Sequence, residues 1–235
     1  MGAKNFVTKN KKDNEKYKSD KINLTFLKNI VNDSFARFAK MNSFSIFNSI
    51  NDILYLVYST EKKSIVFYNM INNQKIAEIK TSHKFGITNF TYYLDNFNKR
   101  DLIISISGED NNLKLWNVNN LDCLLNIENE TNNLKLYSAC LLNDNNQIYI
   151  VIGNLNNEPS EIFDLNGNIV KKINNFNDSV FFIDTYYDIM NSRIYILTCN
   201  TKFVKSYDYT NNKEYHIYND LNKGYINSSF KEYSK

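Results

Sequence analysis

The stretch from Leu102 to Asn117 reads LIISISGEDNNLKLWN, and it contains two apolar segments joined by a polar one. The first segment is rich in Ile and ends at Ser107, and the second alternates apolar and polar residues before it reaches Trp116. Asp and Asn favour tight turns, because their side chains bond to nearby backbone groups and Asn tolerates the left-handed conformation. The stretch therefore predicts a β-hairpin with a polar turn.

Three more segments of this kind recur along the chain at a regular interval. Each ends in an aromatic residue followed by Asn or Asp, and the four landmark pairs are Tyr68 and Asn69, Trp116 and Asn117, Phe163 and Asp164, and Tyr207 and Asp208. The aromatic residues of these landmark pairs are separated by 48, 47 and 44 positions. This interval is close to the forty-odd residues of a four-stranded propeller blade.

The same order of strands is expected around every landmark pair. An apolar strand comes before it, at residues 53–59, 102–107, 147–153 and 193–199, and a weaker strand follows it, at 75–80, 122–128, 169–173 and 213–218. An alternating strand opens the next unit, at 87–94, 137–142 and 180–187. We therefore expect an all-β fold, a β-propeller of four-stranded antiparallel blades with about four blades and the start of a fifth.

The expected propeller domain spans residues 35–235. Its blades are expected at about residues 42–81, 87–129, 136–175 and 180–220, and the start of the next blade at 225–235. We expect a Lys-rich N-terminal tail at residues 1–34. Its stretch 22–30 is either the closing strand of the propeller or an amphipathic helix, and the candidate helix of the chain lies near residues 26–40. A chain that ends inside a blade is expected to be the N-terminal part of a longer propeller, because an incomplete ring leaves unpaired strands exposed.

The second unit resembles the WD-repeat (tryptophan-aspartate repeat) family. In that family a strand of small residues runs through an Asp-containing turn into a strand that ends in Trp-Asp. Asp110 lies six residues before Trp116, at the place of the family's turn aspartate, and His83 lies where the histidine that opens a repeat is found. The resemblance implies a structural hydrogen-bond network that links His83, a strand serine (Ser105 or Ser107), Trp116 and Asp110.

The chain also departs from the family pattern. Trp-Asp is Trp116-Asn117 in the second unit, and the other three units have Tyr or Phe in place of Trp. Only the second unit has the histidine, so the network is expected in one blade. The propellers of the family usually have seven blades, and they act as platforms for protein partners.

Asparagine is unusually frequent, with 42 residues in the chain. Such a composition can mark a polar low-complexity segment that aggregates. Here, however, the Asn pairs fall between apolar runs, at 72–73, 111–112, 145–146 and 211–212. We therefore interpret them as turn residues that replace the scarce glycine.

Residues suited to chemistry are few. A catalytic arrangement would have only His83 and His216 as histidine bases, and we interpret the first as the structural repeat histidine and the second as an outer-strand residue. Cys123, Cys140 and Cys199 lie in or beside apolar runs without CxxC spacing, and we expect them to be buried, reduced thiols. We expect no catalytic residues, no metal site and no cofactor, since phosphate-binding glycine motifs are also missing.

These observations favour a non-catalytic scaffold that binds protein or peptide partners, as part of a larger complex. The net charge is +3, and much of the excess lies in the Lys-rich tail, so a platform associated with RNA or an anionic membrane through this tail and surface Lys patches is the alternative. We expect no specific nucleic acid partner. We also expect no transmembrane segment, since no apolar run approaches about 18 residues.

A cryptic hydrolase based on His83 is a third hypothesis. The expected location is the cytoplasm, with the nucleus as the alternative.

Overall fold

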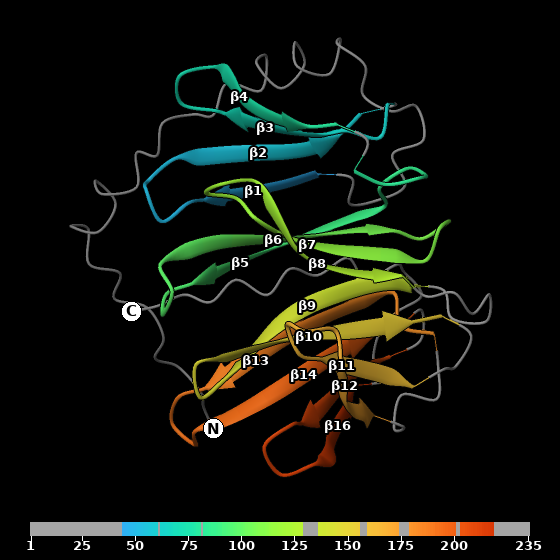
Figure 1. Ribbon diagram of the computed structural model, residues 1–235. Helices are drawn as coiled ribbons and strands as arrows, with labels where there is room; N and C mark the ends of the chain where they lie inside the picture. Colours follow the sequence, from blue (N-terminus) through green and yellow to red (C-terminus); the bar gives the residue numbers. More distant parts are fainter. Residues whose placement is uncertain are drawn as a thin grey trace, which may run out of the picture. The chain divides into compact units, whose positions relative to one another are not determined.

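The protein is described from a computed structural model that covers residues 44–60, 62–80, 82–128, 136–155, 159–173, 179–200 and 203–218. All of these residues belong to one compact unit, residues 36–235. They form four antiparallel sheets of four strands each, which follow one another in chain order (Figure 1). The chain is therefore an all-β protein with the blades of a β-propeller. The expected tail, its closing strand or helix, and the start of a fifth blade lie outside the described residues.

Each sheet is called a blade and numbered along the chain. Blade 1 contains β1 (Phe44–Asn48), β2 (Leu54–Ser59), β3 (Ile65–Asn69) and β4 (Gln74–Ile79). Blade 2 contains β5 (Asn89–Asp95), β6 (Arg100–Ser107), β7 (Asn112–Asn117) and β8 (Asp122–Glu128). Blade 3 contains β9 (Leu136–Asp144), β10 (Gln147–Asn154), β11 (Ser160–Phe163) and β12 (Ile169–Ile173). Blade 4 contains β13 (Phe182–Asp188), β14 (Arg193–Cys199), β15 (Val204–Asp208) and β16 (Lys213–Tyr218).

The strands in the middle of the blades are buried on both faces. In β6, for example, Ile103 and Ile104 are both fully buried although successive side chains of a strand point to opposite faces. Ile103 packs in a cluster with residues of blade 1, and Ile104 packs in a cluster with residues of blade 3. A third cluster joins blades 3 and 4 around Val151 and Ile196. The hydrophobic core therefore consists of layers between neighbouring blades.

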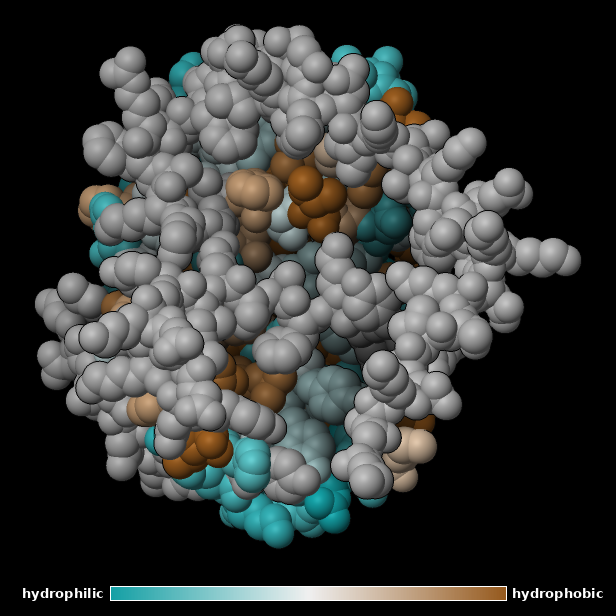
Figure 2. Space-filling model, turned by 180° about the vertical axis from the view of Figure 1, so that it is seen from behind, coloured by the Kyte–Doolittle hydropathy of each residue, from teal (hydrophilic) through white to brown (hydrophobic). Residues whose placement is uncertain are grey.

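The fourth strand of each blade is more exposed, as expected for the outer strand. β8 and β12 show mostly exposed side chains, whereas β7 and β11 beside them are mostly buried. Hydrophobic side chains nevertheless remain visible on the described surface, among hydrophilic ones, in the view from behind (Figure 2). The weaker apolar pattern of these outer strands in the sequence therefore has a direct cause, because only one of their faces meets a neighbour.

Hydrogen bonds from side chains join the innermost strands of blades 2, 3 and 4. The Thr91 hydroxyl of β5 donates to the Ala139 carbonyl of β9 at 2.8 Å, and the Thr185 hydroxyl of β13 donates to the Leu141 carbonyl of β9 at 2.9 Å. Both bonds end on the same strand, two residues apart. β9 is therefore fixed to both neighbouring blades by polar contacts as well as by apolar packing.

Asparagine occupies the turns in the way that the sequence predicts. Each of the four Asn pairs has a residue with positive φ, and these residues are Asn73, Asn111, Asn145, Asn146 and Asn212. Positive φ is a conformation that Gly and Asn adopt at low cost. The interpretation of Asn as a turn residue is confirmed for these positions.

Gly153 of β10 allows a close approach between blades 3 and 4, and its replacement by Ala should be destabilising. A Cβ atom at this position would lie 2.6 Å from Ser138 Oγ and 2.7 Å from a methyl group of Val180. We expect Gly153→Ala to lower the free energy of unfolding by about 1–3 kcal/mol, as overpacked cores do. Gly86→Ala is the matched control, because a Cβ there meets nothing within 4 Å. Urea denaturation measures both variants, and equal stabilities would contradict the proposed close packing.

Candidate functional site

Three residues of the expected network meet inside blade 2. Ser105 Oγ lies 2.7 Å from His83 Nε2, and Trp116 Nε1 donates to the same hydroxyl oxygen at 2.8 Å. All three side chains are buried. The Ser105 hydroxyl therefore bridges the imidazole of His83 and the indole of Trp116. The sequence does not distinguish Ser105 from Ser107 as the serine of the network, and in the structure Ser105 makes both contacts.

Asp110 and Ser107 lie in the same region but do not complete the network. Asp110 Oδ2 accepts from the backbone N–H groups of Lys84 and Phe85, at 3.0 and 3.4 Å, so the carboxylate holds the loop that follows His83. His83 Nδ1, Asp110 Oδ1 and Ser107 Oγ are buried and have no hydrogen-bond partner among the described residues. The geometry is that of a structural support for a loop.

Burial controls the ionisation of His83. Its pKa falls from the ordinary value of 6.5 to about 4, mainly because burial disfavours the charged ring; Asp110 raises the pKa and Lys114 lowers it. The ring is therefore neutral at pH 7. This position inside the blade gives His83 the surroundings of a core residue.

The depressed pKa of His83 makes stability depend on pH. Between pH 6.5 and 4 the unfolded chain binds a proton that the folded chain does not, so stability falls as the pH falls through this window. The loss from this group should reach about 3 kcal/mol near pH 4. Urea unfolding at several pH values, compared between wild type and His83→Gln, isolates the contribution. An equal pH dependence in both proteins would contradict it.

The second residue of every landmark pair caps a turn. Asn69, Asn117 and Asp208 end the third strands of their blades, and Asp164 directly follows the third strand of blade 3. The Oδ1 atom of each accepts from backbone N–H groups two to four residues later, at 2.8–3.3 Å. The aromatic residues before them differ: Trp116, Phe163 and Tyr207 are buried between blades, and Tyr68 is partly exposed. The shared function of the landmark pairs is therefore to fix the turn between the third and fourth strands.

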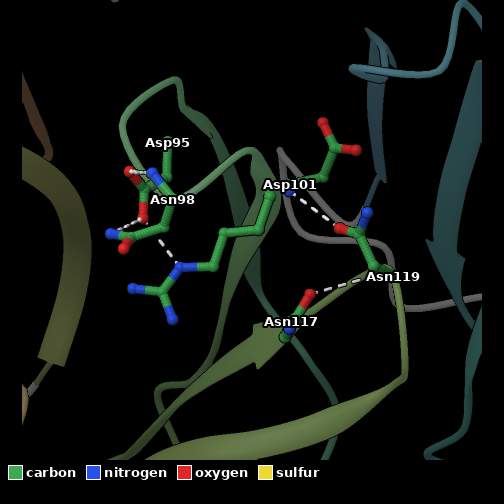
Figure 3. Close-up of polar contacts among 6 residues, drawn as sticks. Asp95, Asn98, Asp101, Asn117 and Asn119 are labelled. Carbon is green, nitrogen blue, oxygen red and sulfur yellow. Dashed lines mark hydrogen bonds and ion pairs between the residues drawn. The ribbon is translucent and has the colours of Figure 1, made fainter.

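A similar but unexpected cap lies at the turns between the first and second strands. Asp95 accepts from the backbone and side chain of Asn98 at 3.1 and 2.8 Å, and from Arg100 Nε at 2.7 Å (Figure 3). Burial alone would raise the pKa of Asp95, but these bonds outweigh it and lower the pKa. Asp188 and Asn191 repeat the arrangement in blade 4. The signal was present in the sequence, as Asp-x-x-Asn-x-Arg at residues 95–100 and 188–193.

Asp101 joins blades 1 and 2. Its buried carboxylate accepts from the Ile50 backbone N–H, at 3.0 and 3.2 Å, and from the Tyr92 hydroxyl at 2.8 Å. The Tyr92 ring stacks on Phe47 of blade 1, with 3.8 Å between ring centroids. On the other side, the Asp101 backbone N–H donates to Asn119 Oδ1 at 2.9 Å (Figure 3). No sequence motif predicted this contact between blades.

One hollow in the surface brings three blades together. It has a volume of about 950 Å³ and is lined by turns β5–β6, β9–β10 and β13–β14, which lie on the left side of Figure 1. We call the surface formed by these three turns, residues 96–99, 145–146 and 189–192, the hairpin-turn face. Apolar side chains project from two of these turns: Phe97 is 63% exposed, Ile189 73% and Met190 96%.

The cysteines and the remaining histidine have structural positions. Cys140 and Cys199 are buried, and burial raises the pKa of both thiols; Asp184 raises that of Cys140 further. The expectation of burial is wrong for Cys123, which is exposed because it lies on the outer strand β8. His216 lies on the outer strand β16 and is exposed, as predicted.

In the described part of the chain, His, Cys, Asp and Glu residues nowhere gather in a group of three that could hold a metal ion. Across the same ranges, no helix has the length and apolar character to cross a membrane.

Comparisons with known proteins extend this description. No family model matches the chain, and no curated protein matches it. Among solved structures, 658 chains are similar. One is a crystal structure of BBS1N in complex with ARL6DN, soaked with lead, with a TM-score of 0.56 and 13% identity over 77% of this chain. The chain spans 57% of the length of that structure. At this identity the likeness shows the fold alone, and that fold is a β-propeller of four-stranded antiparallel blades.

Proposed function

We propose that the chain is a non-catalytic scaffold for protein–protein interaction, built on a WD-repeat propeller and acting in the cytoplasm, with the nucleus as the alternative location. The observation that carries the proposal is the exposure of Phe97, Ile189 and Met190 on the hairpin-turn face. Ile189 and Met190 are adjacent on one turn, and contiguous exposed apolar surface marks sites at which another molecule binds.

The caps of these turns support the proposal. Asp95 and Asp188 hold the turns that carry the exposed apolar side chains, through bonds to backbone and side-chain groups of Asn98 and Asn191. A turn that is already ordered loses little conformational entropy when a partner binds, so more of the contact energy appears as affinity. The hairpin-turn face therefore has the properties of a preformed docking surface.

The WD-repeat assignment and the scaffold class have separate support. The bonds among His83, Ser105 and Trp116 join three of the four residues that the resemblance to the WD-repeat family links, and this supports the assignment. BBS1N, a structural neighbour, was crystallised in complex with ARL6DN, so a propeller of similar fold carries a protein partner. The alternative, a platform for RNA or membranes, depends on the Lys-rich tail, which lies outside the described residues.

The experiment is affinity capture of the full-length protein from its own cells, followed by mass spectrometry. Met190→Asp should remove partners of the hairpin-turn face, because it places a charge where an apolar contact is expected; losses of roughly 30-fold are typical for a central contact. Ile217→Asp, on the outer strand β16 of the same blade, is the matched control. Equal recovery with both variants would argue against the hairpin-turn face. A recovery that collapses after nuclease treatment would favour the RNA alternative.

A further inference from the structure

The hollow on the hairpin-turn face results from a difference in turn length. The β5–β6 turn (96–99) and the β13–β14 turn (189–192) each have four residues, whereas the β9–β10 turn (145–146) of the blade between them has two. All three turns line the same hollow of about 950 Å³. The short turn of blade 3 therefore forms a floor, and the longer turns of blades 2 and 4 form the walls.

The short turn of blade 3 is held by side-chain hydrogen bonds, as the longer turns of blades 2 and 4 are. Asn145 and Asn146 both have positive φ, at 51° and 65°, as a two-residue hairpin turn requires. Asn143 Oδ1 accepts from the Asn146 backbone N–H at 3.0 Å, and Asp144 Oδ1 accepts from the Asn145 side chain at 3.0 Å. The hollow is thus a preformed feature of the folded chain.

The lining of the hollow favours one sign of charge. It includes Tyr93, Tyr186 and Tyr187, and the last two are about half exposed. Asp144 is the charged residue of the described lining, which contains no Lys or Arg. Arg100 and Arg193, which directly follow the two walls, are engaged with the carboxylates of Asp95 and Asp208. Lys99 is exposed on the β5–β6 turn and does not line the hollow.

Aromatic faces and a carboxylate together attract a cation. The electrons of a tyrosine ring present a negative face to a Lys or Arg side chain, and the attraction grows as water is displaced. A carboxylate beside the rings adds a direct Coulombic attraction. An anionic ligand such as a phosphate would find no cationic partner in this lining.

From these observations we infer that the hollow binds a Lys or Arg side chain carried by an exposed segment of a protein partner. The cationic side chain enters between Tyr93 and Tyr187 beside Asp144, while Phe97, Ile189 and Met190 contact apolar residues that flank it. This inference rests on the proposed function, and it names the chemistry of the partner.

The test uses the full-length protein and immobilised pools of short peptides, with randomised flanks and a fixed central residue. The central residue is Arg, Lys, norleucine or Glu, and the bound protein is quantified for each pool. We expect the Arg or Lys pool to retain roughly tenfold more protein than the norleucine pool. The net charge of +3 makes non-specific attraction favour the Glu pool, so a preference for cations has to arise locally.

Variants of the lining locate the preference. Asp144→Asn and Tyr187→Leu should each reduce the ratio of Arg to norleucine retention to near one, and Tyr187→Phe should keep it, because the ring remains. Asp122→Asn, at an exposed position of β8 away from the hollow, is the matched charge control and should keep the ratio. Equal retention of the Arg, Lys and norleucine pools, or an unchanged ratio in Asp144→Asn, overturns the inference.

The inference and the proposed function can fail separately. If Met190→Asp abolishes capture of cellular partners while Asp144→Asn leaves both capture and peptide retention unchanged, the hairpin-turn face binds proteins and the cation site is wrong. If neither variant affects capture of cellular partners, the proposed function of this face fails. Retention of single-stranded RNA in competition with the Arg pool would assign the hollow to a different class of partner and would also overturn the inference.

Discussion

Trp116→Ala is expected to lower the free energy of unfolding by about 3–5 kcal/mol, the largest effect of any single substitution considered for this chain. The indole is buried between blades 1 and 2, where it packs in a cluster with Val57, Phe67 and Ile103. Its removal leaves a cavity in this layer and also deprives Ser105 of its hydrogen-bond donor. Chemical denaturation at pH 7, followed by circular dichroism, measures the loss.

A second variant separates the two parts of this effect. Trp116→Phe keeps an aromatic ring in the layer but removes the N–H group that donates to Ser105, so its cost should be about 1–3 kcal/mol. Ser105→Ala removes the acceptor of the same bond and also the contact of Ser105 with His83. The costs of Ser105→Ala and Trp116→Phe should be non-additive, because both changes break the bond between Trp116 and Ser105. A cost below about 1 kcal/mol for Trp116→Ala would mean that the layer between these blades is not closely packed.

Asp101→Ala is the second substitution with a large expected effect, about 2–4 kcal/mol of the free energy of unfolding. It removes the acceptor of the Ile50 backbone N–H and of the Tyr92 hydroxyl, and both donors are left without this partner between blades 1 and 2. Thermal and urea unfolding report the loss. Because the affected groups belong to both blades, the variant should also increase amide hydrogen exchange in the β1–β2 turn.

The controls for this prediction use the same side-chain chemistry. Asp122→Ala removes an exposed carboxylate of β8 and should change stability by less than about 0.5 kcal/mol. Asp101→Asn retains a carbonyl oxygen as acceptor, so its cost should lie between those of Asp122→Ala and Asp101→Ala. If Asp101→Ala and Asp122→Ala had equal stabilities, the contact between blades 1 and 2 would contribute nothing to the fold.

Much of the fold could be predicted from local patterns of the sequence. The bounds expected for β8, β12, β14 and β16 are those observed, because in each case a run of strand residues is limited on both sides by Asn-rich or charged turns. For β1, the sequence contains no comparable run of strand residues limited by turns on both sides. Three of its five side chains are exposed, so apolar residues such as Phe44 and Ile46 occur where burial does not require them.

The residues of the site were predictable only where one blade contains them. His83 and Trp116 meet at a serine of the strand between them, but Ser105 and Ser107 are two residues apart and face the same side of β6, so their pattern alone could not distinguish them. Asp101 bonds to a backbone group 51 residues away in another blade. Contacts between blades depend on how the blades pack against one another, and the residue pattern within one blade does not record this packing.

The two threonine hydroxyls that bond to β9 have a consequence for solubility. β9 is the edge strand of its sheet, and a free edge is a template on which another chain can add a strand and begin to aggregate. The Ala139 and Leu141 carbonyls already accept from Thr91 and Thr185, so an incoming strand would have to displace both hydroxyls. Blade 3 thus protects its edge with hydroxyl groups from its two neighbours.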